Sequence, residues 1–427
     1  MSDEEALCCE CAEDQFLQTL IDKQGEDGYC SICKSQCGKT ISADRLGQLL
    51  EPILRTALRI GRLGYREEQM GDLLEYFVAV ALGQDEDSAF VKAVVKGVCD
   101  SDDYWPPDGG EAYWDETQFY EAAPVHAGRY TQLWRHTQEE LRHTQRYFSP
   151  SAQAFFSKLF SDVHVLQVSG HRVPPTSVAK MLPAGSILFR SRVMDSSLSP
   201  KQIVQDPLKA VGPPPALLAK AGRMNAEGIP VFYGAITAKT ALSEVRPAMG
   251  QLVATIEVRT RSDLLLLDFS MLEKVSDVSH ISYFDPDRQE KIERREFLRV
   301  LHSRITTPVI PGQESEYLIT QAMAEYLAHL HHPRFDGIEF RSAQDPGGAN
   351  VVLFPSKLDE ILLDKEEPSA ARFDIDYVDD SVGFRKTKAI DYLSEDLKHQ
   401  VHPNGDVLVG YQDEVDYIAA QEWNDFE

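Results

Sequence analysis

Six of the seven cysteines lie within the first 37 residues, and no other feature constrains the fold of this segment as strongly. Cys8 and Cys11 form one CxxC pair, and Cys30 and Cys33 form a second. A CxxC knuckle turns two sulfur atoms toward one point, so two knuckles joined by a short segment suit a tetrahedral zinc ion. The spacing therefore predicts that residues 1–40 fold as a zinc-binding knuckle held by these four cysteines.

The ligand set has alternatives, because Cys9 and Cys37 could each replace a neighbour. Four thiolate ligands leave no open coordination position, so the predicted metal is structural and not catalytic. The competing interpretation is a mobile tail with free thiols. In a reducing cytosol a disulfide framework is the less expected outcome.

Length and charge limit the organisation and the partners of the chain. A chain of 427 residues is expected to contain two or three domains. Its 43 basic and 68 acidic side chains give a formal net charge of −25. Such a surface repels polyphosphate backbones, so a nucleic-acid partner is not expected unless a local basic patch exists. Acidic residues are dense toward the end of the chain, and residues 366–427 are interpreted as an acidic extension.

The chain shows no sign of a membrane or export segment. It opens with Ser2, Asp3, Glu4 and Glu5, and not with a basic region before an apolar run. The most apolar stretch, Leu73–Leu82, is too short to span a bilayer. We therefore expect a cytoplasmic protein without a membrane partner.

Residues 41–160 have the pattern of a helical domain. Between Ser42 and Val98, apolar residues recur at helical spacing, and Ser42 is a candidate N-cap. Met70–Leu82 and Ala89–Val98 are separate apolar helices in this interpretation. Asp100–Gly110 is predicted to be a loop, and Glu116–Phe148 resumes the helical pattern.

Residues 171–365 change in character after the proline-rich segment Arg172–Gly185. Short β-rich runs alternate there with helical segments, which predicts an α+β fold for this part of the chain. The predicted strands are Ser186–Val193, Val231–Ala235, Leu252–Val258, Leu264–Asp268, Gly337–Phe340 and Asn350–Phe354. The predicted helices are Thr240–Val245, Arg288–Ser303 and Tyr317–Leu330.

Polar residues at the ends of these segments form a candidate site. Arg190 ends an apolar run, and Arg223 follows a glycine, so both could offer a planar guanidinium to a phosphate. Tyr233 offers a flat ring for stacking. Glu244, in a predicted capped helix, could hold a ribose hydroxyl and stabilise positive charge at an anomeric carbon.

Two further features complete this candidate site. Ser342 follows a short strand, where its hydroxyl could bind a ligand, and Gly348 with Asn350 precedes the last strand, where glycine allows a close backbone approach. Each of these residues taken alone also has an ordinary explanation, such as a surface ion pair, a core aromatic ring or a turn.

The order of the segments nevertheless resembles the RES domain, a family named for its arginine, glutamate and serine. The matching segments are Ile187–Arg190, Gly222–Asn225 with Gly228 and Tyr233, Thr240–Arg246, Asp336–Ile338 with Ser342, and Gly348–Phe354. The resemblance implies a central β core similar to that of ADP-ribosyltransferases. It also implies a toxin that cleaves the nicotinamide–ribose bond of NAD by hydrolysis or by phosphorolysis, with phosphate as co-substrate in the second case.

The resemblance also assigns roles to residues. It implies that Arg190 and Arg223 hold the NAD phosphates, Tyr233 faces the nicotinamide, Glu244 organises the ribose and Ser342 supports the nucleotide. Gly348 and Asn350 belong to the implied binding segment. Phe189 stands where many members have tyrosine, so it receives no polar role.

The amino-terminal half resembles the HEPN/RES domain that is found fused to RES domains. HEPN ribonucleases use an arginine and a histidine a few residues apart, and Arg129 and His136 have that spacing. The expectation here is a packing or sensing role, with RNA cleavage or RNA sensing as an alternative. Mono-ADP-ribosylation of a protein is the other alternative to NAD cleavage. The resemblance also suggests an antitoxin or trigger protein as a partner, a setting in antiphage defence, and a homodimer.

Overall fold

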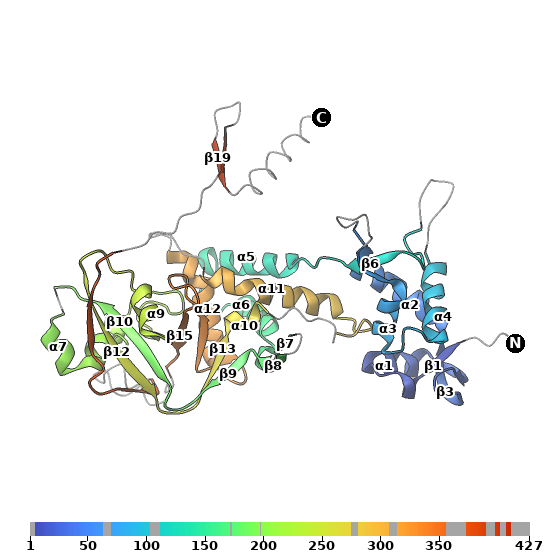
Figure 1. Cartoon of the computed structure of the whole chain (residues 1–427), viewed down its shortest axis with the longest axis horizontal. Helices are drawn as coiled ribbons and strands as arrows, with labels where there is room; N and C mark the ends of the chain where they lie inside the picture. The colour runs from blue at the N-terminus through green and yellow to red at the C-terminus, as the bar shows by residue number, and fades with distance from the viewer. Residues whose placement is uncertain are drawn as a thin grey trace.

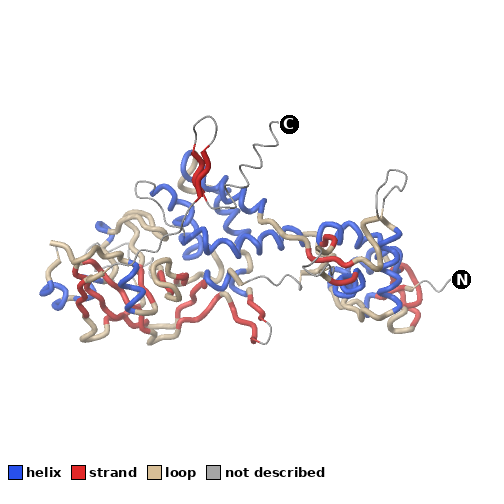
Figure 2. The backbone as a smooth tube through the Cα atoms, turned by 45° about the horizontal axis from the view of Figure 1, so that its top comes forward, coloured by secondary structure: helices blue, strands red, loops and turns tan. Residues whose placement is uncertain are grey.

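The computed structural model describes residues 5–62, 70–102, 112–170, 173–196, 198–274, 281–306, 314–355, 373–389, 398–401 and 407–410. Figure 1 shows an elongated molecule with the first 120 residues at one end and a large β-sheet at the other. Long helices lie between these two ends, as the secondary-structure colours of Figure 2 also show. Within the described ranges, none of the helices has the length and apolar character needed to cross a bilayer.

Within the described residues, the amino-terminal core contains two small antiparallel sheets and four α-helices. The sheets have the orders β1-β3-β2 and β4-β6-β5. The strands are β1 (Ala6–Cys8), β2 (Glu26–Cys30), β3 (Ser35–Ser42), β4 (Leu58–Ile60), β5 (Asp72–Leu73) and β6 (Phe119–Ala122). The helices are α1 (Gln15–Gln24), α2 (Ala43–Ala57), α3 (Leu74–Leu82) and α4 (Ala89–Asp100), with a 3-10 turn at Cys9–Cys11.

Helix α2 illustrates why this core forms. Its predicted N-cap is confirmed, since the Ser42 side chain accepts a hydrogen bond from the Arg45 amide. Its fully buried leucines recur at helical spacing along one face. Gly47 lets α2 approach α4 closely, because a Cβ atom at this position would lie 2.4 Å from the carbonyl carbon of Gly97. The predicted loop Asp100–Gly110 lies largely outside the described residues, and Asp100 itself ends α4.

The second core joins a group of helices to one face of the large sheet. These helices are α5 (Gly128–His143), α6 (Pro150–Leu159), α10 (Phe269–Leu272), α11 (Arg288–Thr306) and α12 (Leu318–Glu325), the last continued by a π-helical turn at Tyr326–Leu330. The buried faces of α5 and α6 belong to the same apolar cluster as those of α11 and α12. The Trp134 and Phe297 rings, for example, are 5.7 Å apart.

This packing places α5 and α6 on the sheet side of the molecule, whereas the sequence interpretation grouped them into a helical domain of residues 41–160. The reason is the apolar face of α5, which carries Tyr130, Trp134 and Leu141 and lies against α11. The helical pattern predicted over Glu116–Phe148 is realised only in α5. Residues 119–122 form β6 instead.

The α+β fold predicted for the second half is confirmed, and all six predicted strands are present. The sheet has nine strands in the order β16-β12-β10-β11-β15-β14-β13-β9, with β17 also paired to β12. All pairings are antiparallel except that of β13 with β14. The strands are β9 (Ala179–Leu182), β10 (Ile187–Val193), β11 (Phe232–Ala235), β12 (Leu252–Thr260), β13 (Leu264–Asp268), β14 (Gly337–Arg341), β15 (Ala349–Leu353), β16 (Ile375–Tyr377) and β17 (Gly383–Lys386).

Both faces of this sheet are covered. Alternate side chains point to opposite faces, so Leu266 and Val351 belong to one apolar cluster while Leu267 and Val352 belong to the other. The remaining elements are α7 (Pro200–Gln205), α8 (Pro207–Val211), α9 (Ala238–Glu244) and the two-stranded pairs β7 (Gln167–Gly170) with β8 (Val173–Ser177) and β18 (Lys398–Val401) with β19 (Val407–Gly410).

Part of the predicted acidic extension, residues 366–427, belongs to this sheet. Strands β16 and β17 both pair with β12. Phe373 and Ile375 are buried in the apolar cluster beneath them, which explains why this segment returns to the sheet. Residues 366–372, 390–397, 402–406 and 411–427 of the predicted extension lie outside the described residues.

Candidate active site

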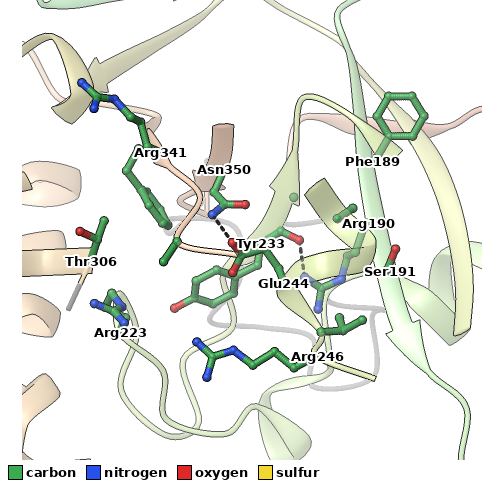
Figure 3. A pocket seen from close by; sticks show the side chains of 15 residues that line it. Phe189, Arg190, Ser191, Arg223, Tyr233, Glu244, Arg246, Thr306, Arg341 and Asn350 are labelled. Atoms are coloured by element: carbon green, nitrogen blue, oxygen red, sulfur yellow. Dashed lines mark hydrogen bonds between the residues drawn. The ribbon is translucent and has the colours of Figure 1, made fainter. Parts of the chain in front are cut away.

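A cavity of about 320 Å³ lies where β10, β11 and β15 meet α9 and the end of α11. Its volume is within the range of small-molecule sites. Because β11 pairs with both β10 and β15, residues far apart in the sequence come together at its wall. The lining residues include Arg190, Arg223, Tyr233, Glu244, Arg246, Thr306, Phe340, Arg341 and Asn350. Figure 3 shows how their side chains surround the cavity.

Arg190 is fixed by main-chain carbonyl groups. Its Nε donates hydrogen bonds to the carbonyl oxygens of Val211, at 2.8 Å, and Gly212, at 3.2 Å. Its Nη1 donates to the carbonyl oxygen of Tyr233 at 2.5 Å. Burial lowers the pKa of Arg190 to about 10, so the guanidinium stays charged at neutral pH. The Arg190 side chain is therefore a rigid cation in the cavity wall.

Arg223 lies on the opposite side of the cavity. Its Nη1 donates to the carbonyl oxygen of Ile305, in the last turn of α11, and its guanidinium carbon lies 5.8 Å from the centre of the Tyr317 ring. Burial lowers the pKa of this group as well. Two arginines from different parts of the chain thus line one cavity, a suitable arrangement for binding two phosphates.

Tyr233 supports the loop that carries Arg223. The Tyr233 hydroxyl donates to Asn225 Oδ1 at 2.9 Å and accepts from the Met224 amide at 3.0 Å. Gly222 is required in this loop, because a Cβ atom there would lie 2.8 Å from the Tyr233 hydroxyl. Burial raises the pKa of Tyr233 to about 12, so the hydroxyl stays protonated. With its hydroxyl engaged, Tyr233 presents chiefly its ring to the cavity.

Glu244, at the end of α9, is held by two side chains from other elements. Its Oε1 accepts hydrogen bonds from Ser342 Oγ at 2.5 Å and from Asn350 Nδ2 at 2.8 Å. In the described part of the chain, its Oε2 makes no hydrogen bond. The helix itself begins as predicted, with Thr237 accepting from the Thr240 amide. The result is an oriented carboxylate with one oxygen directed to partners and one oxygen left for a ligand.

Ser342 and Gly348 stand behind Glu244 and do not line the cavity. Ser342 Oγ accepts hydrogen bonds from the amides of Gln344 and Asp345, at 3.1 and 3.0 Å, and so shapes the loop after β14. Gly348 packs against this loop, where a Cβ atom would lie 2.5 Å from Thr240 Oγ1 and 2.8 Å from Asp345 Oδ2. Ser342 thus connects Glu244 to this loop, and the direct ligand contacts predicted for Ser342 and Gly348 stay a prediction.

Two cavity arginines received no role in the sequence analysis. Arg246 is exposed, and its side chain makes no hydrogen bond or ion pair within the described ranges. Its φ of 45° is unusual for a residue other than glycine. Arg341 forms an ion pair with Glu273. The signal for Arg246 in the sequence is its place two residues after Glu244, within the segment Thr240–Arg246 that resembles the RES domain. Four arginines and one carboxylate make the cavity positive within a chain of net charge −25.

The cysteine knuckles form a candidate metal centre. The sulfur atoms of Cys8, Cys11, Cys30 and Cys33 all lie within 4.8 Å of one another and could hold a metal ion. A hydrogen bond from Ser35 is the main cause that lowers the pKa of Cys33 to about 6, whereas burial raises the pKa of Cys11 and of Cys30. This geometry selects the predicted set over the alternatives with Cys9 or Cys37, although the Cys37 sulfur lies 3.9 Å from that of Cys33.

The Arg129 and His136 pair lies on α5, and both side chains are exposed. Arg129 forms an ion pair with Glu290 at 3.2 Å. Glu290 also pairs with Lys158, so Arg129 is part of a small surface network. A surface network of this kind is consistent with packing between α5, α6 and α11.

The comparison with protein families agrees with this site. Residues 194–376 match the model of the RES domain family. The matched range contains Arg223, Tyr233, Glu244, Ser342, Gly348 and Asn350 of the predicted NAD site, and Arg190 lies four residues before it. The RES-like character of this part of the chain is therefore confirmed, while the HEPN-like character of the amino-terminal half stays a prediction. No curated protein and no solved structure matches the chain.

Proposed function

We propose that the arginine-lined cavity binds NAD and that the protein cleaves its nicotinamide–ribose bond. The observation that carries this proposal is the Glu244 carboxylate, fixed through one oxygen by Ser342 and Asn350 and placed beside Arg190, Arg223 and Arg246. The match of this region to the RES domain supports the same substrate, since the resemblance implies an enzyme that acts on NAD.

In this proposal the arginines bind the diphosphate of NAD. Arg190 and Arg223 are already oriented by main-chain carbonyls, so little side-chain entropy is lost when they bind an anion. The acidic remainder of the chain repels anions, and the cavity offers them a local positive potential. The Tyr233 ring provides a flat surface against which the nicotinamide or ribose can pack.

Glu244 then acts on the bond that breaks. The electron pair of the C1′–N1 bond moves to the nicotinamide ring, which leaves as a neutral molecule, and positive charge develops on the ribose. The free Oε2 of Glu244 stabilises that charge or holds a ribose hydroxyl. An oxygen of water or phosphate adds to C1′ and its proton is released, so the products are nicotinamide and ADP-ribose or ADP-ribose 1″-phosphate.

The test is to incubate the purified protein with NAD, with and without phosphate, and to separate the products by chromatography. Glu244→Gln keeps the size of the side chain but loses its charge, and we expect NAD cleavage to fall by about 100-fold or more. Glu227→Gln is the matched control, because Glu227 is exposed in the same region and outside the cavity. Equal rates for Glu244→Gln and wild type would reject Glu244 as catalytic.

The product beside nicotinamide identifies the acceptor. ADP-ribose alone indicates hydrolysis, and a phosphorylated ADP-ribose that depends on added phosphate indicates phosphorolysis. Transfer of labelled ADP-ribose to a protein in a lysate would indicate mono-ADP-ribosyltransferase activity in place of hydrolysis or phosphorolysis. Absence of nicotinamide release under every condition, including lysate, would contradict the proposal of NAD cleavage.

We also propose that the ion in the cysteine cluster is zinc. The four ligands are all sulfur, which favours zinc over magnesium or calcium. In a tetrahedral site with Zn–S bonds of about 2.3 Å, sulfur atoms are separated by about 3.8 Å, and the sulfur atoms of Cys8 and Cys33 are 3.9 Å apart. Bound there, zinc would stabilise the fold of the first 40 residues.

A further inference from the structure

His302 is a buried polar residue that the proposed mechanism does not use. It lies on α11, one turn before the end of the helix, and is 4% exposed. It does not line the cavity. Its two ring nitrogens nevertheless connect α10 to β14: Nδ1 contacts Glu273 Oε1 at the end of α10, and Nε2 accepts a hydrogen bond from the Arg341 amide at 3.1 Å.

These contacts fix the tautomer of the ring. An amide N–H can only donate, so Nε2 has to be the unprotonated nitrogen, and Nδ1 carries the proton that it donates to Glu273. The second oxygen of Glu273 forms an ion pair with the Arg341 guanidinium. Arg341 is thus held twice, through its backbone by His302 and through its side chain by Glu273.

Arg341 is linked to Glu244 through Ser342, one of the two side chains that hold the carboxylate. Arg341 is the last residue of β14, and the next residue is Ser342. The Ser342 amide donates to the Gly348 carbonyl at 2.9 Å, and its hydroxyl donates to Glu244 at 2.5 Å. A displacement of the Arg341 backbone would therefore carry Ser342 away from Glu244.

We propose that His302 is a positioning residue that holds Glu244 in its reactive orientation through Arg341 and Ser342. This inference rests on the proposed function, and it adds a residue that neither the sequence analysis nor the mechanism assigns. The same helix end holds Arg223 through the Ile305 carbonyl, so α11 positions both sides of the cavity. The hydrogen bond from Arg341 to Nε2 is the contact that the proposal requires.

Two substitutions separate the roles of the two nitrogens. The terminal amide oxygen of His302→Gln reaches the region of Nε2 and can still accept from the Arg341 amide. The shorter His302→Asn places its amide near Nδ1, so it keeps a donor for Glu273 and loses the acceptor for Arg341. We expect His302→Asn to lower kcat for NAD cleavage on the order of 10- to 100-fold with little change in KM. His302→Gln should retain most of the wild-type kcat.

A merely structural role would lower the thermal stability and activity of both variants alike, and that result would overturn the proposal. The decisive measurement combines His302→Asn with Glu244→Gln. If His302 acts through Glu244, the double variant has the same residual rate as Glu244→Gln alone, because the carboxylate that it positions is already absent. If the rate of the double variant falls by the product of the two single-variant losses, the proposal is rejected.

A second measurement does not depend on activity. In protein labelled with ¹⁵N at histidine, the His302 resonances are assigned by their loss in His302→Gln, and they should report a proton on Nδ1 and none on Nε2 at neutral pH. The opposite tautomer would overturn the proposal even in an active enzyme. If wild type does not cleave NAD but the tautomer is as expected, the proposed function fails and the Arg341 contact stands.

Discussion

The metal cluster and the cavity are assembled in opposite ways. The four cysteines lie within one short segment, and two tight turns bring their sulfur atoms together. The groups around Glu244 come from distant segments, since 98 residues separate it from Ser342 and 106 separate it from Asn350. The spacing of cysteines in the sequence therefore specifies the metal cluster, whereas the order of strands in the sheet specifies the cavity. The first should depend on its ligand for stability, and the second should depend on the fold around it.

The largest expected effect is that of metal removal on the amino-terminal core. Metal binding contributes on the order of 10 kcal/mol in small zinc folds, so a chelator should unfold this core and leave the melting of the sheet region unchanged. Calorimetry with and without chelator would show two separate transitions. A single transition that is insensitive to the chelator would contradict the contrast between the two sites.

The cysteine alternatives give this prediction a control. Cys11→Ser should abolish metal binding, since Cys11 belongs to the four-sulfur cluster. Cys37→Ser should keep one metal ion per chain, as measured by elemental analysis. Loss of the metal ion in Cys37→Ser together with its retention in Cys11→Ser would show that Cys37 is a ligand and Cys11 is not.

The next effect tests whether the amino-terminal core is a separate unit of stability. Gly47→Ala would force a Cβ atom against the backbone of Gly97 and separate α2 from α4, which should cost about 1–3 kcal/mol. Gly38→Ala is the control, because a Cβ atom there meets no heavy atom within 4 Å. Thermal unfolding should show a lower first transition for Gly47→Ala alone. A shift of both transitions would mean that the two cores unfold as one.

Within the cavity, Asn350→Leu tests how much of the orientation of Glu244 comes from a distant strand. The change keeps the approximate size of the side chain and removes the donor to Oε1, so Glu244 is held by Ser342 alone. A hydrogen bond to a charged group is worth about 1.5–3 kcal/mol when buried, and for the exposed Glu244 we expect a loss near the lower end, roughly tenfold in kcat. Initial rates at saturating NAD measure it. An unchanged kcat would mean that Ser342 alone is sufficient.

Sequence patterns predicted the secondary-structure elements better than they predicted which elements pack against each other. The six strands were evident because their short β-rich runs are separated by turn residues. The apolar periodicity of α5 indicates that Trp134 is buried, but it does not indicate which element covers this residue. In the structure that element is α11. The division of the chain near residue 160 stays a prediction, although α5 and α6 share their apolar core with α11 and α12.

The candidate site shows the same limit. Arg190, Arg223, Tyr233, Glu244 and Asn350 were selected from the sequence, and the structure brings all five to one cavity. His302 gave no signal, because its partners Glu273 and Arg341 lie 29 and 39 residues away and a histidine within an amphipathic helix is unremarkable. The positions of Ser342 and Gly348 behind Glu244 depend on the shape of one loop, which the sequence does not specify.

The smallest effect concerns Arg246, the cavity arginine whose side chain has no hydrogen-bond or ion-pair partner in the described ranges. Arg190 and Arg223 are tied to backbone carbonyls, whereas Arg246 is exposed and projects from a backbone with positive φ. An exposed ion pair is worth about 0.2–1 kcal/mol, so Arg246→Gln should raise KM for NAD by roughly two- to fivefold and leave kcat unchanged. Arg259→Gln is the control, since Arg259 is exposed on β12 away from the cavity. Because salt screens exposed charges, the difference should shrink at high ionic strength. A loss of kcat in place of KM would place Arg246 at the reacting ribose and not at the phosphates.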